Sequence, residues 1–122
     1  ANRYEIMAGY ARGMRGALQQ ELDALKARSN DAAMVKAATR WLHRDEEKVP
    51  ASALPQLAQA RAASPVLDKM VTMRAELRQL WLNTSLNREQ MLTNLQAWCL
   101  RAEESGIAAL QDFSRKLRAA QA

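Results

Sequence analysis

The chain has 122 residues, of which 48% are hydrophobic and 25% are charged, a composition typical of a folded domain and too apolar for a disordered one. Its single cysteine excludes an intramolecular disulfide, and the lack of any run of about 20 apolar residues excludes a membrane-spanning helix. Strong helix formers dominate, whereas aromatic residues make up only 5%. We therefore predict an all-α fold, a single-domain bundle of about six helices with a long N-terminal helix.

The first predicted helix covers residues 2–28. Apolar residues recur in it at gaps of three and four, which places on one face Met7, Tyr10, Met14, Leu18, Leu22 and Leu25. Gly9, Gly13 and Gly16 form a stripe almost opposite that face. Because glycine weakens a helix, we expect this stripe to be a packing interface for another helix, within the bundle or from a second copy in a homodimer. The alternative is a weak helix whose glycine stripe faces solvent.

Five further helices are predicted from capping residues and apolar spacing. They cover residues 31–43, 52–62, 65–83, 88–104 and 107–120. The expected N-caps are Asn30 or Asp31, then Ser52, Ser64 and Asn87, the last in a capping box with Gln90. Gly106 is expected to follow the fifth helix in the left-handed conformation.

The apolar faces of these helices carry the aromatic residues that should form the core. Trp41, Trp81 and Trp98 each fall on such a face, and we expect all three to be largely buried. Leu54 and Leu57 are expected to face inward from the short helix over residues 52–62.

The stretch "LQAWCLRAEESGIAAL" at 95–110 contains Cys99, Glu103 and Glu104, which an enzyme could use as a nucleophile and a base. On a helix, however, Cys99 lies on the apolar side, and neither glutamate is spaced to meet a histidine. We interpret Cys99 as structural and predict no catalytic residue in the chain. The stretch is then a helix, a turn and a second helix.

Metal binding is limited by the supply of ligands. The only histidine, His43, and the only cysteine cannot form a His/Cys zinc site, and the paired Glu-x-x-His motifs of a di-iron bundle are lacking. We predict no metal, no cofactor and no small-molecule ligand in this segment, and interpret His43 as a surface residue near a helix end.

The net charge is +5, from 18 basic and 13 acidic side chains. Residues 1–28 carry five basic and three acidic residues, and residues 84–122 carry five and four. Nucleic-acid binders more often concentrate positive charge on one face. We therefore expect no strong affinity of the chain for DNA, and keep nucleic acid as an alternative partner.

Three stretches, "ANRYEIMAGYARGMR", "WLHRDEEKVPASALPQLAQARAASPVLDKMVTMRAELRQLW" and "LQAWCLRAEESGIAALQDFSRKLR", resemble the C-terminal region of proteobacterial membrane fatty acid desaturases. In that family a membrane domain with histidine boxes and a di-iron centre precedes a helical extension. The resemblance implies a domain excised from a larger protein of lipid metabolism, with a non-catalytic role in association or regulation. It also implies a cytoplasmic location, tethered to the inner membrane by the parent membrane domain, which would be the partner and hold the di-iron.

The stretches "RWLHRDEEKV…LPQLAQA…SPVLDKMVTMRAELRQLW" and "WCLRAEESGIAALQDFSRKLR" are also similar to the helical part of insertion-sequence transposases with a DDE catalytic core. This resemblance implies an alternative function, a helical nucleic-acid-binding or insertion domain of a transposase. The sequence has no recognisable DDE triad, and position alone does not make Asp45 or Glu104 a member of one. Upstream sequence would separate the two families, by histidine boxes among apolar spans or by an acidic core.

Overall fold

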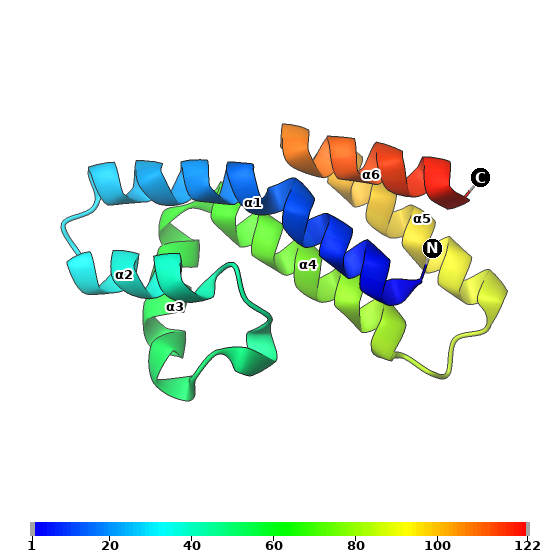
Figure 1. The fold of residues 1–122 in the computed structure, drawn as a ribbon, viewed down its shortest axis with the longest axis horizontal. Helices are drawn as coiled ribbons and strands as arrows, with labels where there is room; N and C mark the ends of the chain where they lie inside the picture. The colour runs from blue at the N-terminus through cyan, green and yellow to red at the C-terminus, as the bar shows by residue number, and fades with distance from the viewer. Residues whose placement is uncertain (1, 122) are drawn as a thin grey trace. The chain divides into compact units, whose positions relative to one another are not determined.

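The structure, a computed structural model, describes residues 2–121 and contains six α-helices in that range (Figure 1). They are α1 (Arg3–Arg28), α2 (Ala32–Trp41), α3 (Leu54–Ala63), α4 (Pro65–Leu82), α5 (Arg88–Glu104) and α6 (Ala108–Gln121). Two short 3-10 turns, Glu46–Lys48 and Ala51–Ala53, lie between α2 and α3. The described residues form no strand, so the predicted all-α class and the long first helix are confirmed.

The N-termini of three helices are fixed by the side chains that the sequence indicates. Asp31 caps α2 by accepting a hydrogen bond of 3.0 Å from the Met34 amide. Ser64 accepts from the Leu67 amide at 3.2 Å at the start of α4. At α5 the Asn87 and Gln90 side chains each accept from the other residue's amide, which completes the predicted capping box.

The start of α3 differs from the prediction. Residues Ala51–Ala53 form a 3-10 turn, and α3 begins at Leu54 without a side-chain cap, so Ser52 does not serve as the N-cap. This later start leaves Leu54 in the first turn, 54% exposed, whereas Leu57 is buried as expected. An N-cap at Ser52 would accept from the amide of Leu54 or of residue 55, but the Leu54 amide already donates to the Ala51 carbonyl and Pro55 has no amide hydrogen.

Contacts between Cα atoms divide the chain into two compact units, and both α1 and α4 contribute residues to each. We call residues 2–14 with 72–121 the terminal unit, and residues 15–71 the central unit. In the terminal unit α5 and α6 run antiparallel and side by side (Figure 1), joined by a turn in which Gly106 has a φ of +74°. That conformation is the predicted left-handed helix end.

An aromatic cluster forms the core of the terminal unit. Trp98 of α5 is 0% exposed and meets Tyr10 and Phe113 edge to face, with ring centroids 6.1 and 5.7 Å away. Tyr10 and Phe113 also contact each other edge to face, at 5.2 Å. The Trp98 Nε1 donates a 2.9 Å hydrogen bond to the Met73 carbonyl, and burial raises the pKa of Tyr10. The cluster therefore joins α1, α4, α5 and α6.

The glycine stripe of α1 faces Phe113 over part of its length. A Cβ atom added at Gly9 or Gly13 would lie 3.8 or 3.9 Å from the Phe113 ring, which is ordinary van der Waals contact. A Cβ atom at Gly16 would have nothing within 4 Å. Within the terminal unit α6 thus approaches the first two glycines, and a homodimer contact along the stripe stays a prediction.

The expectation that all three tryptophans are largely buried holds completely for Trp98 and to a lesser degree for Trp41 and Trp81. Trp98 is fully buried, but Trp41 and Trp81 are only half-buried. Trp41 is the last residue of α2 and Trp81 is next to the last residue of α4. At a helix end the chain turns away, so fewer neighbours are available to cover a large side chain.

Two glycine substitutions should change stability in opposite directions. Gly16→Ala should raise the free energy of unfolding by about 0.5–1 kcal/mol, because it improves helix propensity without a new contact. Gly106→Ala should lower it by about 1 kcal/mol, because alanine is strained at a positive φ. Urea unfolding followed by circular dichroism measures both. Destabilisation by Gly16→Ala would instead reveal a partner packed on the stripe.

Tryptophan fluorescence should distinguish the buried indole of Trp98 from the two half-buried indoles. Trp98→Phe should shift the emission to the red and increase quenching by iodide, because only the two half-buried indoles remain. Trp41→Phe is the matched control. It should shift the emission to the blue and decrease quenching by iodide. Equal effects of the two variants, with the helical circular dichroism retained, would contradict the difference in burial between Trp98 and Trp41.

Candidate functional site

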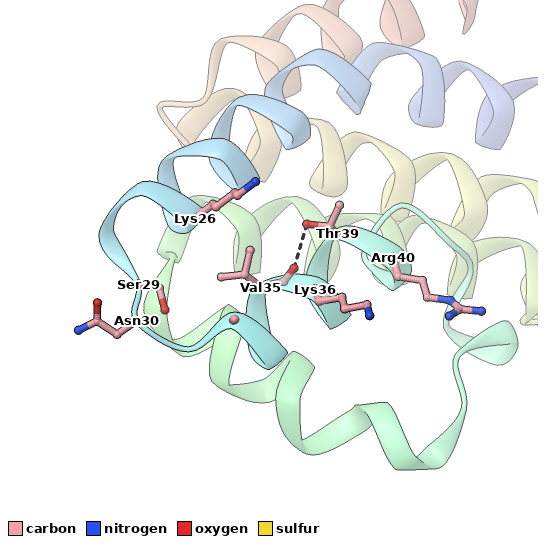
Figure 2. A pocket seen from close by; sticks show the side chains of 8 residues that line it. Lys26, Ser29, Asn30, Val35, Lys36, Thr39 and Arg40 are labelled. Atoms are coloured by element: carbon pink, nitrogen blue, oxygen red, sulfur yellow. Dashed lines mark hydrogen bonds between the residues drawn. The ribbon is translucent and has the colours of Figure 1, made fainter.

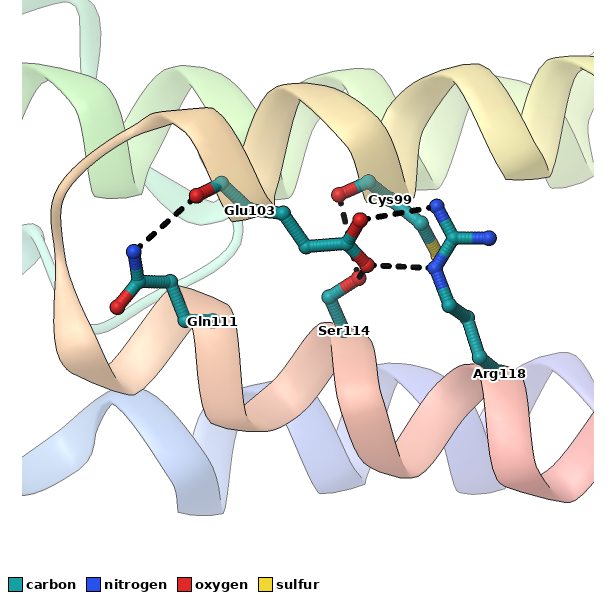
Figure 3. A network of polar contacts seen from close by, with 5 residues as sticks. All are labelled: Cys99, Glu103, Gln111, Ser114 and Arg118. Carbon is teal, nitrogen blue, oxygen red and sulfur yellow. Dashed lines mark hydrogen bonds and ion pairs between the residues drawn. The ribbon is translucent and has the colours of Figure 1, made fainter.

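The stretch around Cys99 is a structural contact between α5 and α6 (Figure 3). Glu103 accepts two hydrogen bonds from Arg118, 2.5 Å from Nε and 3.0 Å from Nη2. The Ser114 hydroxyl lies 2.6 Å from the Glu103 carboxylate and 3.2 Å from the Cys99 carbonyl. Gln111 donates to the Glu103 carbonyl at 3.1 Å. Five hydrogen bonds thus hold the two helices together.

These contacts determine what Glu103 can do chemically. The hydrogen bonds from Arg118 and then Ser114 lower the pKa of Glu103, and the carboxylate in turn raises the pKa of Arg118. A carboxylate with a lowered pKa is a weak base. Cys99 itself is 2% exposed beside Trp98. The arrangement fits the interpretation of Cys99 as a structural residue.

The other residues considered from the sequence lie apart from this contact. His43 is half-buried in the turn after α2, and Asp45 precedes the 3-10 turn Glu46–Lys48. Glu104 is the exposed last residue of α5. Across residues 2–121 no three His, Cys, Asp or Glu side chains gather as a metal site would require. Over the same range no helix is long and apolar enough to cross a membrane.

A different site is present in the central unit, where α1 ends and α2 begins (Figure 2). An open hollow of about 570 Å³ is lined by Lys26, Ser29, Asn30, Ala32, Val35, Lys36, Thr39 and Arg40. Three of these residues are cationic and none is acidic. We call this surface the basic corner. Its chemistry suits an anion.

Local structure explains how the cations reach the basic corner. Lys26 lies in the last turn of α1, and Lys36 and Arg40 lie one turn apart on the same face of α2. The Thr39 hydroxyl donates to the Val35 carbonyl at 2.9 Å, so it serves the helix backbone. The Arg40 guanidinium lies 4.9 Å from the centroid of the Trp41 ring, a cation–π contact.

The basic corner lies in a stretch of concentrated positive charge. Counting charges over residues 1–28 and 84–122 does not reveal this stretch. Residues 26–44 contain one acidic residue, Asp31, and five basic ones, which are Lys26, Arg28, Lys36, Arg40 and Arg44. Their net charge of +4 leaves only +1 for the rest of the chain. The segment 1–28 ends inside this stretch and so divides its charges. A sliding window of about 20 residues would have found it.

Comparison with known families decides between the two resemblances. Residues 5–122 match the DDE_Tnp_ISL3 family model, whose description is transposase. The chain belongs to this transposase family. No curated protein and no solved structure matches the chain.

The accessory role in a fatty acid desaturase is therefore wrong, as is the assignment to lipid metabolism. The inferred tether to the inner membrane loses its basis with the desaturase. The resemblance to desaturases was carried by helical segments without any catalytic motif. Such segments report helix pattern and composition, and these are shared by unrelated helical proteins.

Glu103→Gln in this transposase chain should alter the dependence of stability on pH. A group with a lowered pKa stabilises the fold above its ordinary pKa of about 4.5, and that stabilisation is lost as the pH falls through the folded value. Wild type should therefore lose more stability between about pH 7 and pH 3 than the variant does. Urea midpoints at the two pH values measure this. Glu104→Gln, which removes the neighbouring carboxylate of α5, is the control for the loss of one negative charge.

Proposed function

We propose that this chain is a non-catalytic helical domain of a DDE transposase, which supports a catalytic core supplied by other residues of the protein. The observation that carries the proposal is the match of residues 5–122 to the transposase family by a chain whose described part is helical. The match includes the helices of both units.

The positions of the acidic side chains support a non-catalytic role. A DDE site requires three carboxylates that converge on metal ions. In this chain Asp31 caps α2, Asp68 pairs with Arg61 at 2.7 Å, and Glu103 pairs with Arg118. Glu76 and Arg101 form a further pair at 2.8 Å, which connects α4 with α5. These carboxylates stabilise helices and the contacts between them.

The test is DNA cleavage by the natural protein that contains this chain, on a linear duplex that carries the ends of its element. Asp45→Asn and Glu104→Gln should leave the cleavage rate within about twofold of wild type. Trp98→Ala should abolish cleavage, because removal of a buried tryptophan costs about 3–5 kcal/mol of stability.

Two results would contradict the proposal. Loss of cleavage in Asp45→Asn or Glu104→Gln, with the melting temperature retained, would place a catalytic carboxylate in the chain. Failure of the folded wild-type protein to cleave or join any element end would contradict the transposase function itself.

A further inference from the structure

We propose that the basic corner binds the phosphate backbone of duplex DNA without reading its sequence. The inference rests on the proposed function, because a transposase acts on DNA, and it deepens that function by assigning a contact surface. The cations of this surface are Lys26 from α1 with Lys36 and Arg40 from α2 (Figure 2).

The first argument is the local charge. Residues 26–44 carry a net charge of +4, and their one acidic residue, Asp31, already accepts a hydrogen bond from the Met34 amide. No acidic side chain lines the hollow itself. Three cations around one open hollow with no acid among them create a positive potential that attracts a polyanion. The rest of the chain, at +1, competes little for the same ligand.

The second argument is spacing. Lys36 and Arg40 are four residues apart on α2, a rise of about 6 Å. Phosphates follow one another along a DNA strand at about 3.4 Å of axial rise, so the two cations span about two phosphates. Lys26 adds a cation from α1, and Ser29 and Asn30 line the same hollow with groups that can donate hydrogen bonds to phosphate oxygens.

The third argument separates duplex DNA from a single strand. Proteins that hold single strands stack bases on exposed aromatic rings. The aromatic ring that Arg40 of the basic corner contacts, Trp41, is half-buried, with the guanidinium of Arg40 at 4.9 Å and that of Arg44 at 5.7 Å from its centroid. A base could stack there only after these contacts were broken. The surface therefore offers charge and hydrogen bonds, which suit the outside of a duplex.

The expected affinity follows from the number of cations. Neutralising three phosphates gives a slope of about −2.7 for log K against log salt, so a rise from about 50 to 200 mM salt should weaken binding about 40-fold. An affinity that depends on three contacts is modest, and so agrees with the expectation of no strong affinity for DNA.

The experiment measures fluorescence anisotropy of a labelled 30-base-pair duplex of mixed sequence as the chain is added at the two salt concentrations. The site variant is Lys36→Gln with Arg40→Gln. The control variant, Arg88→Gln with Lys116→Gln, removes the same charge from exposed positions of α5 and α6. Circular dichroism establishes that both variants are folded.

The site variant should retain one phosphate contact and respond only about 3.5-fold to the same change in salt, while the control keeps the response of about 40-fold. Equal losses in the two variants would overturn the inference. So would failure of wild type to bind duplex at the lower salt, or preferential binding to a single strand of equal length or to vesicles with 30% phosphatidylserine. If the binding experiment gives one of these overturning results but the natural protein still cleaves element ends, the assignment of the basic corner as a DNA contact is wrong and the proposed function stands.

Discussion

The packing of Trp98 against Tyr10 and Phe113 is the interaction on which the terminal unit depends. Its indole packs edge to face on both rings, which also contact each other, while its Nε1 donates to the Met73 carbonyl, so one side chain contacts three other helices. A buried indole without a hydrogen-bond acceptor would cost free energy, and the carbonyl of α4 removes that cost. The ion pairs Glu76–Arg101 and Glu103–Arg118 lie at more exposed positions and reinforce the same helix contacts.

Helix ends could be predicted from the sequence wherever a side chain caps the backbone. Ser64, Asn87 and Gln90 make the hydrogen bonds that their positions indicate, because a cap acts within three or four residues and needs no tertiary information. The start of α3 could not be predicted in this way. Ser52 is a good capping residue in isolation, but the backbone continues through a 3-10 turn to Leu54.

The candidate site could be predicted only in part, and for a physical reason. Apolar periodicity reports which face of a helix is buried, and it says nothing of which charged side chains meet across two helices. Lys26 and Lys36 are ten residues apart, and only the turn between α1 and α2 brings them to one hollow. The sequence indicates Glu103 only as a candidate base, because its partners Ser114 and Arg118 belong to the next helix, beyond the reach of local spacing.

The contact between Arg40 and Trp41 has a consequence for conformational entropy. A long arginine side chain in water samples many rotamers, and a ligand that fixes it must overcome about 2 kcal/mol of lost freedom. With its guanidinium already held 4.9 Å from the indole centroid, Arg40 has lost part of that freedom before any ligand arrives. The indole therefore acts as a support that preorganises the cation, and less of the binding free energy is spent on ordering it.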